Sequence, residues 1–243
     1  MNKPEYISKP DWDLVLKKYD LKYVEEQLAK NYPIQYLIGN VDFYDSTILV
    51  NEKVLIPRFE TELLVEKTIG ILTKYNKKIE VLEIGTGSGC ISISIAKNIE
   101  ANVTATDISE EALKVAEGNA KLNNIEINFI KHDILNESIN GKYDLIISNP
   151  PYIKFGDEVD PQTIYEPQNA LFADNNGLIF YEEIIKKSVG HLNDYGLIAF
   201  EIGMDQAKYL EDIAKTYYPS SDVIILKDYN NRDRIVFIKT KEN

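Results

Sequence analysis

The chain has 243 residues, of which 44% are hydrophobic and 27% charged, as in ordinary folded domains. This length suits one large domain, or one domain with a small addition, because domains usually span ~100–200 residues. The 27 basic and 39 acidic side chains give a formal net charge of −12, which disfavours a partner bound mainly through its phosphate groups.

The small numbers of cysteines and histidines and the shortness of the apolar runs exclude further classes of protein. One cysteine, Cys90, and two histidines, His132 and His191, exclude an internal disulfide framework and argue against a zinc site, so we expect no metal. No apolar run approaches the ~20 residues of a membrane-spanning helix, and residues 1–11 lack the apolar stretch of a secretory signal. We therefore expect a cytoplasmic protein that contacts no membrane and has no direct nucleic-acid substrate.

The first third of the chain is predicted to consist of a small helical region and a linking segment. Apolar side chains recur at helical spacing from residue 12 to residue 28, and Tyr32-Pro33 ends the run. Strand-like stretches between Tyr36 and Leu55 predict a hairpin, and a helix is expected over residues 61–75. We therefore place boundaries after residues 35 and 76, which gives regions 1–35, 36–76 and 77–243.

Strands and helices alternate beyond residue 77. The strands are expected at residues 80–84, 102–107, 125–130, 143–148, 197–201, 223–226 and 234–238, and the helices at residues 88–97, 110–122, 178–192 and 206–218. Such alternation favours an α/β fold with a doubly wound, mainly parallel sheet. Only residues 227–233 join the final two strands, too few for a parallel crossover, so we expect an antiparallel last strand.

A glycine-rich turn, Gly85-Thr86-Gly87-Ser88-Gly89, follows the first of these strands and opens a helix. Glycines there allow positive φ and close approach of a ligand to the backbone. The third glycine comes one residue earlier than in the dinucleotide fingerprint, and the Gly-Lys-Ser/Thr of a phosphate loop does not follow. By itself the turn fits either a ligand site or a tight connection without a ligand.

Acidic residues end the next two strands. Asp107 lies 22 residues after Gly85, close to the ~20-residue offset at which an acid accepts hydrogen bonds from ribose hydroxyls. Asp107 could instead cap the following helix, a role that short acidic side chains often fill. Asp133 could accept from an adenine amino group while Ile134 covers the ring, and a solvated loop acid is an equal alternative.

The turn Asn149-Pro150-Pro151-Tyr152 follows a buried strand and is the most specific motif of the chain. Its prolines have no N–H, and Asn149 adds a side-chain carbonyl, so the turn presents several acceptors and few donors. Such a site matches a planar NH2 group, and the Tyr152 ring offers a surface for stacking. A rigid turn that merely ends a strand is the alternative.

Together, residues 83–89, Asp107 and the turn 149–152 resemble an S-adenosylmethionine-dependent methyltransferase that modifies amide or amino nitrogens. Further segments resemble the peptide chain release factor N5-glutamine methyltransferases, and the resemblance runs from Pro33 to the C-terminus; these segments are residues 35–39, 43–44, 54–62, 166–171 and 199–203. Phe59 stands where this family usually has proline, and the N-terminal helical region is shorter than is usual in the family.

The resemblance implies a role for each motif. It implies the S-adenosylmethionine-dependent methyltransferase fold, with residues 77–243 as the catalytic domain and residues 1–35 as a truncated substrate-docking region. The cofactor would be held by Gly85, Thr86, Gly87, Ser88, Gly89, Asp107, Asp133, Ile134 and Asn149. Asn149, Pro150 and Tyr152 would be catalytic, and these three with Pro151 would bind the target glutamine of a release factor. The cofactor product would be S-adenosylhomocysteine.

Other substrates share these motifs. A glutamine in a ribosomal protein, or the exocyclic amine of adenine (N6) or cytosine (N4) in a nucleic acid, needs the same acceptors, and a binding module without activity is a third alternative. Arg58 and Glu62 either begin a solvent-facing helix or belong to a segment that closes over the cofactor pocket. We expect Cys90 to be a small buried residue.

Overall fold

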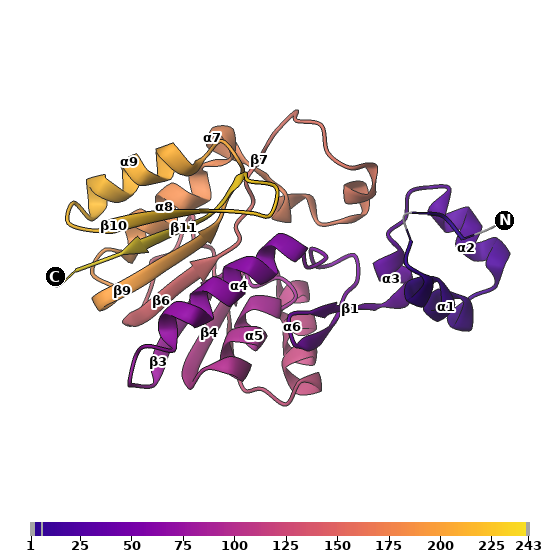
Figure 1. Ribbon diagram of the computed structural model, residues 1–243, viewed down its shortest axis with the longest axis horizontal. Coiled ribbons are helices and arrows are strands. Elements are labelled where there is room, and N and C mark those ends of the chain that lie inside the picture. The colour runs from indigo at the N-terminus through magenta and orange to yellow at the C-terminus, as the bar shows by residue number, and fades with distance from the viewer. Residues whose placement is uncertain (1–2, 6, 242–243) are drawn as a thin grey trace.

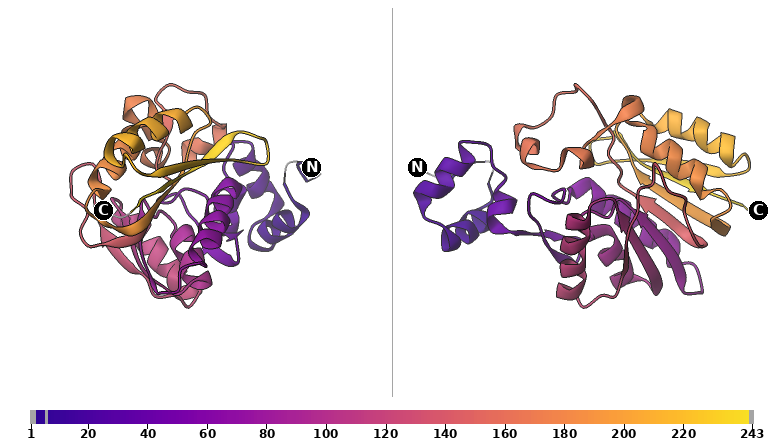
Figure 2. Two further views of the ribbon diagram at one scale, coloured as in Figure 1. Left: turned by 60° about the vertical axis from the view of Figure 1, so that its left-hand side comes forward. Right: turned by 180° about the vertical axis from the view of Figure 1, so that it is seen from behind.

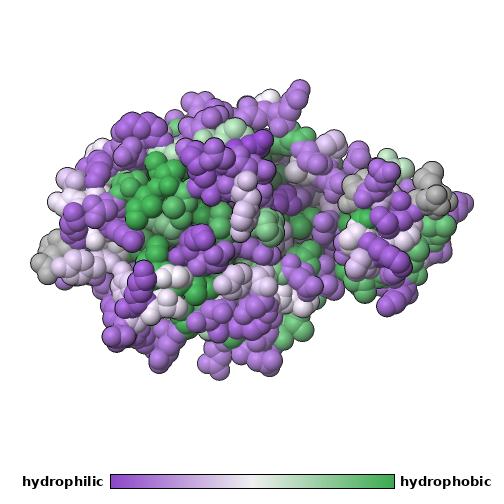
Figure 3. All heavy atoms as spheres, in the orientation of Figure 1, coloured by the Kyte–Doolittle hydropathy of each residue, from purple (hydrophilic) through white to green (hydrophobic). Residues whose placement is uncertain are grey.

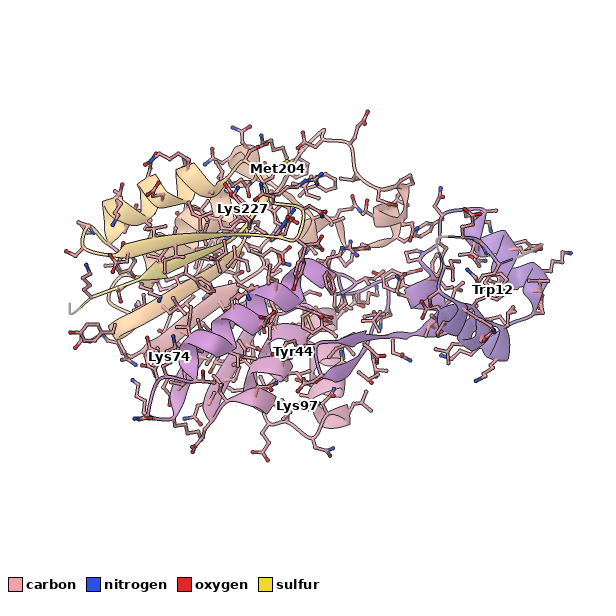
Figure 4. The ribbon with its side chains drawn as sticks, in the orientation of Figure 1. Trp12, Tyr44, Lys74, Lys97, Met204 and Lys227 are labelled. Atoms are coloured by element: carbon pink, nitrogen blue, oxygen red, sulfur yellow. The ribbon has the colours of Figure 1, made fainter. Side chains whose placement is uncertain are left out.

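The computed structural model describes residues 3–5 and 7–241. Helices α1 (Lys9–Lys18), α2 (Leu21–Leu28) and α3 (Ile34–Ile38) form a small bundle beside the rest of the molecule (Figures 1 and 2). The side chains of Ser8 and Asp20 cap α1 and α2. Trp12 packs inside the bundle (Figure 4), in a cluster that also contains Ile7, Val15, Val24, Ile34, Leu37 and Ile38. The expected helical N-terminal region is confirmed.

The linking segment contains a hairpin and a long helix. Strands β1 (Asn40–Phe43) and β2 (Ser46–Leu49) pair in antiparallel fashion, so the hairpin prediction is confirmed for these residues. It is wrong at Tyr36, which lies in α3 and donates its hydroxyl to the Val54 carbonyl at 2.8 Å. The boundary expected at residue 35 therefore falls within α3. Lys97 of α5 (Cys90–Asn98) forms an ion pair with Asp45 in the hairpin turn at 3.8 Å (Figure 4).

Helix α4 (Phe59–Leu72) begins two residues earlier than expected and ends three residues earlier. Pro57 and the extended backbone of its N-cap residue Arg58 precede the first turn, which contains Glu60 and Glu62. Acidic side chains near a helix N-terminus interact favourably with its dipole. Thr61 also lies in this first turn of α4.

The sheet has seven strands in the order β10-β11-β9-β6-β3-β4-β5. Their bounds are β3 Ile79–Ile84, β4 Ala101–Asp107, β5 Asn128–Lys131, β6 Tyr143–Ser148, β9 Leu192–Glu201, β10 Asp222–Lys227 and β11 Asp233–Lys239. Pairing is parallel from β5 to β9, and β11 runs antiparallel to both β9 and β10. The predicted fold class is confirmed, including the antiparallel last strand.

Two predicted boundaries are wrong for local reasons. The helix expected over residues 178–192 is α8 (Ile179–Ser188), and Leu192 already begins β9. The strand expected from Ile125 begins at Asn128, because the Ile125 N–H bonds back to the Ala120 carbonyl at the end of α6 (Glu110–Leu122). Leu192, a strand residue, was thus assigned to the preceding helix, and Ile125, which bonds back to the end of a helix, was assigned to the following strand.

Helices cover both faces of the sheet. Helices α4, α5 and α6 pack with the hairpin on one face, and α8 and α9 (Ala207–Tyr217) on the other (Figure 1). Neighbouring residues of β3 serve both cores, since Val81 belongs to one cluster and Leu82 to the other. Ile224 and Leu226 of β10 are only partly buried, and Figure 3 shows an apolar patch over this part of the sheet.

An excursion separates the Asn149–Tyr152 turn from α8. It contains β7 (Ile153–Lys154), the 3-10 turns η1 (Pro161–Tyr165) and η2 (Gln168–Ala170), β8 (Phe172–Ala173) and the short α7 (Asp174–Gly177). Figures 1 and 2 show it reaching toward the N-terminal bundle. There the Tyr165 hydroxyl donates to the Lys30 carbonyl at 2.9 Å, and its ring meets the edge of Tyr32. The excursion thus bridges the two parts of the molecule.

Within the described residues, every helix is too short or too polar to cross a membrane. The same part of the chain contains no cluster of His, Cys, Asp and Glu side chains that would hold a metal ion.

Candidate functional site

Two cavities meet at the carboxyl edge of the sheet. The first, here called the glycine-loop cavity, has a volume of about 240 Å³ and lies against the ends of β3, β4 and β6. The second, here called the outer cavity, has a volume of about 450 Å³ and lies between the start of α4 and the excursion. Both are lined by Leu55, Asn149, Pro150 and Ala170. The edge is where open α/β sheets bind ligands.

The glycine-rich turn is held in shape by a buried carboxylate. Glu83 accepts from the Thr86 hydroxyl at 2.6 Å and from the Ser92 backbone N–H at 3.2 Å, and the Ser92 hydroxyl also donates to it. Burial raises the pKa of Glu83 to about 7. Gly89 has φ of +83°, and a Cβ on it would lie 3.1 Å from the Ala116 Cβ. The turn therefore fits only small residues at its junction with α6.

Asp107 links the end of β4 to the glycine-rich turn. Its Oδ2 accepts from the Gly87 N–H and its Oδ1 from the Ser109 N–H, each at 2.9 Å. The N-cap of α6 is Ser109, whose hydroxyl accepts from the Ala112 N–H, so Asp107 does not cap that helix. Burial raises the pKa of Asp107, and the two backbone N–H groups oppose this shift. Its carboxylate lines the glycine-loop cavity.

Asp133 and Ile134 follow β5 at the same cavity. Asp133 accepts from the Asn136 side chain at 2.7 Å, which lowers the pKa of the carboxyl, and from the Leu135 N–H at 3.0 Å. Ile134 is buried and presents an apolar surface. Phe180 of α8 adds a second apolar wall that the sequence analysis missed. One end of the cavity thus combines a carboxylate with apolar sides.

The Asn149–Tyr152 turn stands between the two cavities. The Ser148 hydroxyl donates to the Ile84 carbonyl at 2.6 Å and so ties the start of the turn to β3. At its other end, the Tyr152 carbonyl accepts from Gln206 at 3.2 Å, and burial raises the pKa of the Tyr152 phenol. Gly177 packs directly on this carbonyl, since a Cβ there would lie 2.0 Å from the oxygen. The backbone of the turn is therefore fixed from both ends.

Two residues that were not among the predicted site residues join the turn through hydrogen bonds, and they lie in the segments 54–62 and 199–203. The Asn149 Nδ2 donates to Thr61 Oγ1 at 3.1 Å, and that hydroxyl donates to Glu201 Oε2 at 2.6 Å. Glu201 ends β9 and is 1% exposed, and burial raises its pKa to about 7. The sequence signals for Glu201 are its place in the segment 199–203 and, as at Glu83, an acidic residue at the carboxyl end of an apolar strand.

Arg58 closes the outer cavity with Glu166 of the excursion. Its Nη2 donates to both carboxylate oxygens of Glu166, each at 2.8 Å, and both residues line the cavity. Burial raises the pKa of Glu166, and the Arg58 guanidinium opposes the shift. Arg58 lines the outer cavity and not the glycine-loop cavity, so its role stays a prediction. Glu62 lies in the first turn of α4 and lines neither cavity.

Known proteins resemble this chain over most of its length. Residues 60–174 match the methyltransferase small domain family. The release factor glutamine methyltransferase of Lactococcus lactis is 43% identical over 224 residues, which are 90% of this chain and 82% of that protein. The one of Streptococcus pneumoniae is 44% identical over 91% of this chain and 80% of its own length. The chain belongs to the release factor glutamine methyltransferase family. The family and enzyme class predicted from the sequence are confirmed.

Solved structures agree with this membership. A protein-(glutamine-N5) methyltransferase, release factor-specific, from Alicyclobacillus acidocaldarius has a TM-score of 0.51 at 26% identity, over 76% of this chain and 94% of its own. A ribosomal protein L11 methylase from Lactobacillus delbrueckii has a TM-score of 0.59 at 26% identity, over 80% and 86%. The methyltransferase fold is therefore common to proteins whose names give different substrates.

The structure brings most of the predicted site residues of this family member together. The glycine-loop cavity is lined by Gly85, Gly87, Asp107, Asp133, Ile134, Asn149, Pro150 and Pro151, and the outer cavity by Asn149, Pro150 and Tyr152. Thr86, Ser88 and Gly89 line neither. Thr86 bonds to Glu83, and the Ser88 carbonyl accepts from Asn119 at 2.8 Å, so these residues build the turn itself. The individual roles remain predictions.

Proposed function

We propose that this protein transfers the methyl group of S-adenosylmethionine to the side-chain amide nitrogen (N5) of a glutamine in a peptide chain release factor. The observation that carries the proposal is the position of Asn149 and Pro150 in the walls of both cavities. A cofactor in one cavity and a glutamine in the other would meet at these acceptor groups. Membership of the family supports the choice of reaction.

The glycine-loop cavity suits S-adenosylmethionine. Each Asp107 oxygen accepts one backbone N–H and has a further lone pair for a ribose hydroxyl. Asp133 would accept from the adenine amino group, with Ile134 and Phe180 beside the ring. The turn 85–89 would lie against the methionine portion. When bound, the cofactor supplies an electrophilic methyl group.

The target nitrogen needs orientation because it is a poor nucleophile. Its lone pair is delocalised into the carbonyl, the resonance that gives an amide its rotational barrier of ~18–20 kcal/mol. The Asn149 Oδ1 and the Pro150 carbonyl would accept its two N–H groups, and the Tyr152 ring would lie against the amide. Held in this way, the nitrogen would be oriented to accept the methyl group that the cofactor supplies, and it would lose one N–H proton in exchange. The cofactor product is S-adenosylhomocysteine.

The outer cavity favours a protein over a nucleic acid as the partner. Among the described residues its lining contains one cationic side chain, Arg58, and four acidic ones, Glu158, Asp160, Glu166 and Glu201. A phosphate backbone would be repelled by this lining. Gln35 of α3 reaches the same cavity, which supports a docking role for the N-terminal region.

The test is incubation of the enzyme with labelled S-adenosylmethionine and a purified release factor, followed by mass mapping. We expect one glutamine to gain a methyl group, and a release factor with alanine at that glutamine to gain none. Asn149→Ala serves as the enzyme control. If a ribosomal protein or duplex DNA is methylated while the release factor stays unmodified, the proposed substrate is wrong.

A further inference from the structure

Thr61, Asn149 and Glu201 form a hydrogen-bonded chain that joins three separate elements. Thr61 lies in the first turn of α4, Asn149 follows β6, and Glu201 ends β9. The contacts are 3.1 Å from Asn149 Nδ2 to Thr61 Oγ1 and 2.6 Å from Thr61 Oγ1 to Glu201 Oε2. Thr61 is 2% exposed and Glu201 1% exposed, so water does not compete for these bonds.

The chain has a direction that its acidic end imposes. An ionised carboxylate can only accept, so Glu201 takes the single hydroxyl hydrogen of Thr61. The Thr61 oxygen is then left with lone pairs alone on the side of Asn149, where it accepts from the NH2 group. The Asn149 carbonyl oxygen must therefore point away from Thr61. Asn149 contributes to the walls of both cavities, so this oxygen is available to a ligand.

We propose that Glu201, acting through Thr61, holds the Asn149 side chain in the one amide orientation that presents its carbonyl oxygen to the target glutamine. This inference rests on the proposed function and adds two positioning residues to it. In the opposite orientation Asn149 would present NH2 to the NH2 of the substrate, and two donors cannot bond to each other.

The charge state of Glu201 decides whether the direction is imposed. Protonated Glu201 can donate to Thr61, whose own hydrogen is then free to bond to the Asn149 carbonyl. The Asn149 side-chain amide can then rotate into the opposite orientation. Burial raises the pKa of Glu201 to about 7. The charged or titratable groups around it are Arg58, Glu60, Cys90, Tyr152, Tyr181 and Arg234. The methyltransferase should therefore become more active as the pH rises through about 7.

The first test compares three threonine variants in single-turnover methyl transfer. Thr61→Val removes the hydroxyl at nearly constant volume and should reduce the rate at least tenfold, with the cofactor Kd unchanged within twofold. Thr61→Ser restores the hydroxyl and should recover most of the rate. Thr68→Val is the matched control, because Thr68 is a buried residue of the same helix whose hydroxyl has no partner among the described residues. The proposal would be overturned if Thr61→Val transferred the methyl group as fast as Thr68→Val does.

The second test reads the orientation of Asn149 directly and needs no protein substrate. The side-chain ¹⁵N–¹H signals of Asn149 should shift between pH 6 and pH 8 in the unmodified enzyme and stay constant in Glu201→Gln. Glu83, whose pKa burial also raises to about 7, is distinguished by its own variant, since Glu83→Gln should leave the Asn149 titration in place. Signals that do not titrate, or that titrate equally in Glu201→Gln, would overturn the role of Glu201.

The two tests separate this inference from the proposed function. If the unmodified enzyme leaves the release factor unmethylated, the proposed function fails, while the Asn149 signals still report on the hydrogen-bonded chain. If the unmodified enzyme methylates the release factor and Thr61→Val does so at the same rate, the proposed function stands and the positioning role is wrong.

Discussion

The Arg58 guanidinium and the Glu166 carboxylate join the start of α4 to the excursion after the Asn149–Tyr152 turn. Arg58 Nη2 lies 2.8 Å from each carboxylate oxygen, and the two residues are 108 positions apart in the chain. The Glu166 side chain is 2% exposed and that of Arg58 is 34% exposed. The excursion owes its position over the outer cavity partly to this pair, because its strands β7 and β8 are only two residues each.

Loss of Arg58 should therefore affect the protein substrate more than the cofactor. Arg58→Ala leaves a buried carboxylate without its cation, at a cost of about 2 kcal/mol in the free energy of unfolding once the partial exposure of Arg58 is allowed for. We expect a raised KM for the release factor and an unchanged cofactor Kd. Urea unfolding, steady-state kinetics and cofactor titration measure the three quantities.

The double variant Arg58→Ala/Glu166→Gln is the control for this pair. Removing both charges takes away the unpaired buried carboxylate, so part of the lost stability should return. A double variant as unstable as the sum of the two single variants would show that the residues act independently. A weakened cofactor Kd in Arg58→Ala would instead assign Arg58 to the glycine-loop cavity.

Asp107 should act in cofactor binding and little in the methyl-transfer step. A ribose contact is present in both ground and transition states, so its removal changes binding and leaves kcat nearly constant. We expect Asp107→Ala to weaken S-adenosylmethionine binding by about 2 kcal/mol, the usual loss for a hydrogen bond to a charged group. Calorimetric titration measures the affinity, and single-turnover kinetics at saturating cofactor measure the step.

Asp107→Asn refines the test because it keeps one acceptor oxygen and removes the charge. Its affinity should lie between those of the unmodified enzyme and Asp107→Ala. Unchanged cofactor affinity in a folded Asp107→Ala protein would remove the ribose assignment and leave Asp107 as a structural tie to the Gly87 N–H.

Asn149 should act in the transition state. Asn149→Ala removes the side-chain carbonyl that orients the target amide, and we expect a loss of ~2.7–4 kcal/mol in transition-state stabilisation, or ~10²–10³ in kcat. Cofactor affinity should stay within a few-fold, since Asp107 and the glycine-rich turn remain. Single-turnover methylation of a release factor, with cofactor binding measured separately, checks both. Near-normal turnover would reduce the motif to a stiff turn that ends a strand.

The parts of the site that follow single strands could be predicted from sequence. Asp107 ends a strand, and the glycine-rich turn, Asp133 and Asn149 each follow one. Parallel strands bring their carboxyl ends to one edge. The order of the strands and helices along the chain was therefore enough to predict that these residues lie close together. The antiparallel last strand followed from the short connection between residues 227 and 233, a purely local feature.

The contacts between distant segments could not be predicted in this way. Thr61 and Glu201 are 140 residues apart, and their pairing depends on how α4 packs across the end of β9. The excursion has two-residue strands and 3-10 turns, which are too short to produce a periodic pattern. Tyr36 was misassigned because its apolar neighbours fit a strand as well as the single turn of helix that they form.

The buried Glu83 gives the remaining prediction, on stability against pH. Burial raises its folded-state pKa from 4.5 to about 7, so the folded protein holds a proton that the unfolded chain has already released between these values. Stability therefore falls as the pH rises from about 4.5 to about 7, and levels off above.

Glu83→Gln should remove this contribution. The amide is neutral at every pH, so the free energy of unfolding of the variant relative to the unmodified protein should rise between pH 5 and pH 8, by an amount on the order of 3 kcal/mol. The difference between the two proteins is the quantity to measure, because other carboxyls such as Asp144, whose pKa is lowered in spite of burial, contribute the opposite slope to both. Urea unfolding of the cofactor-free proteins at several pH values measures this difference. If the free energies of unfolding of the two proteins change in parallel with pH, Glu83 keeps an ordinary pKa through its bonds to Thr86 and Ser92.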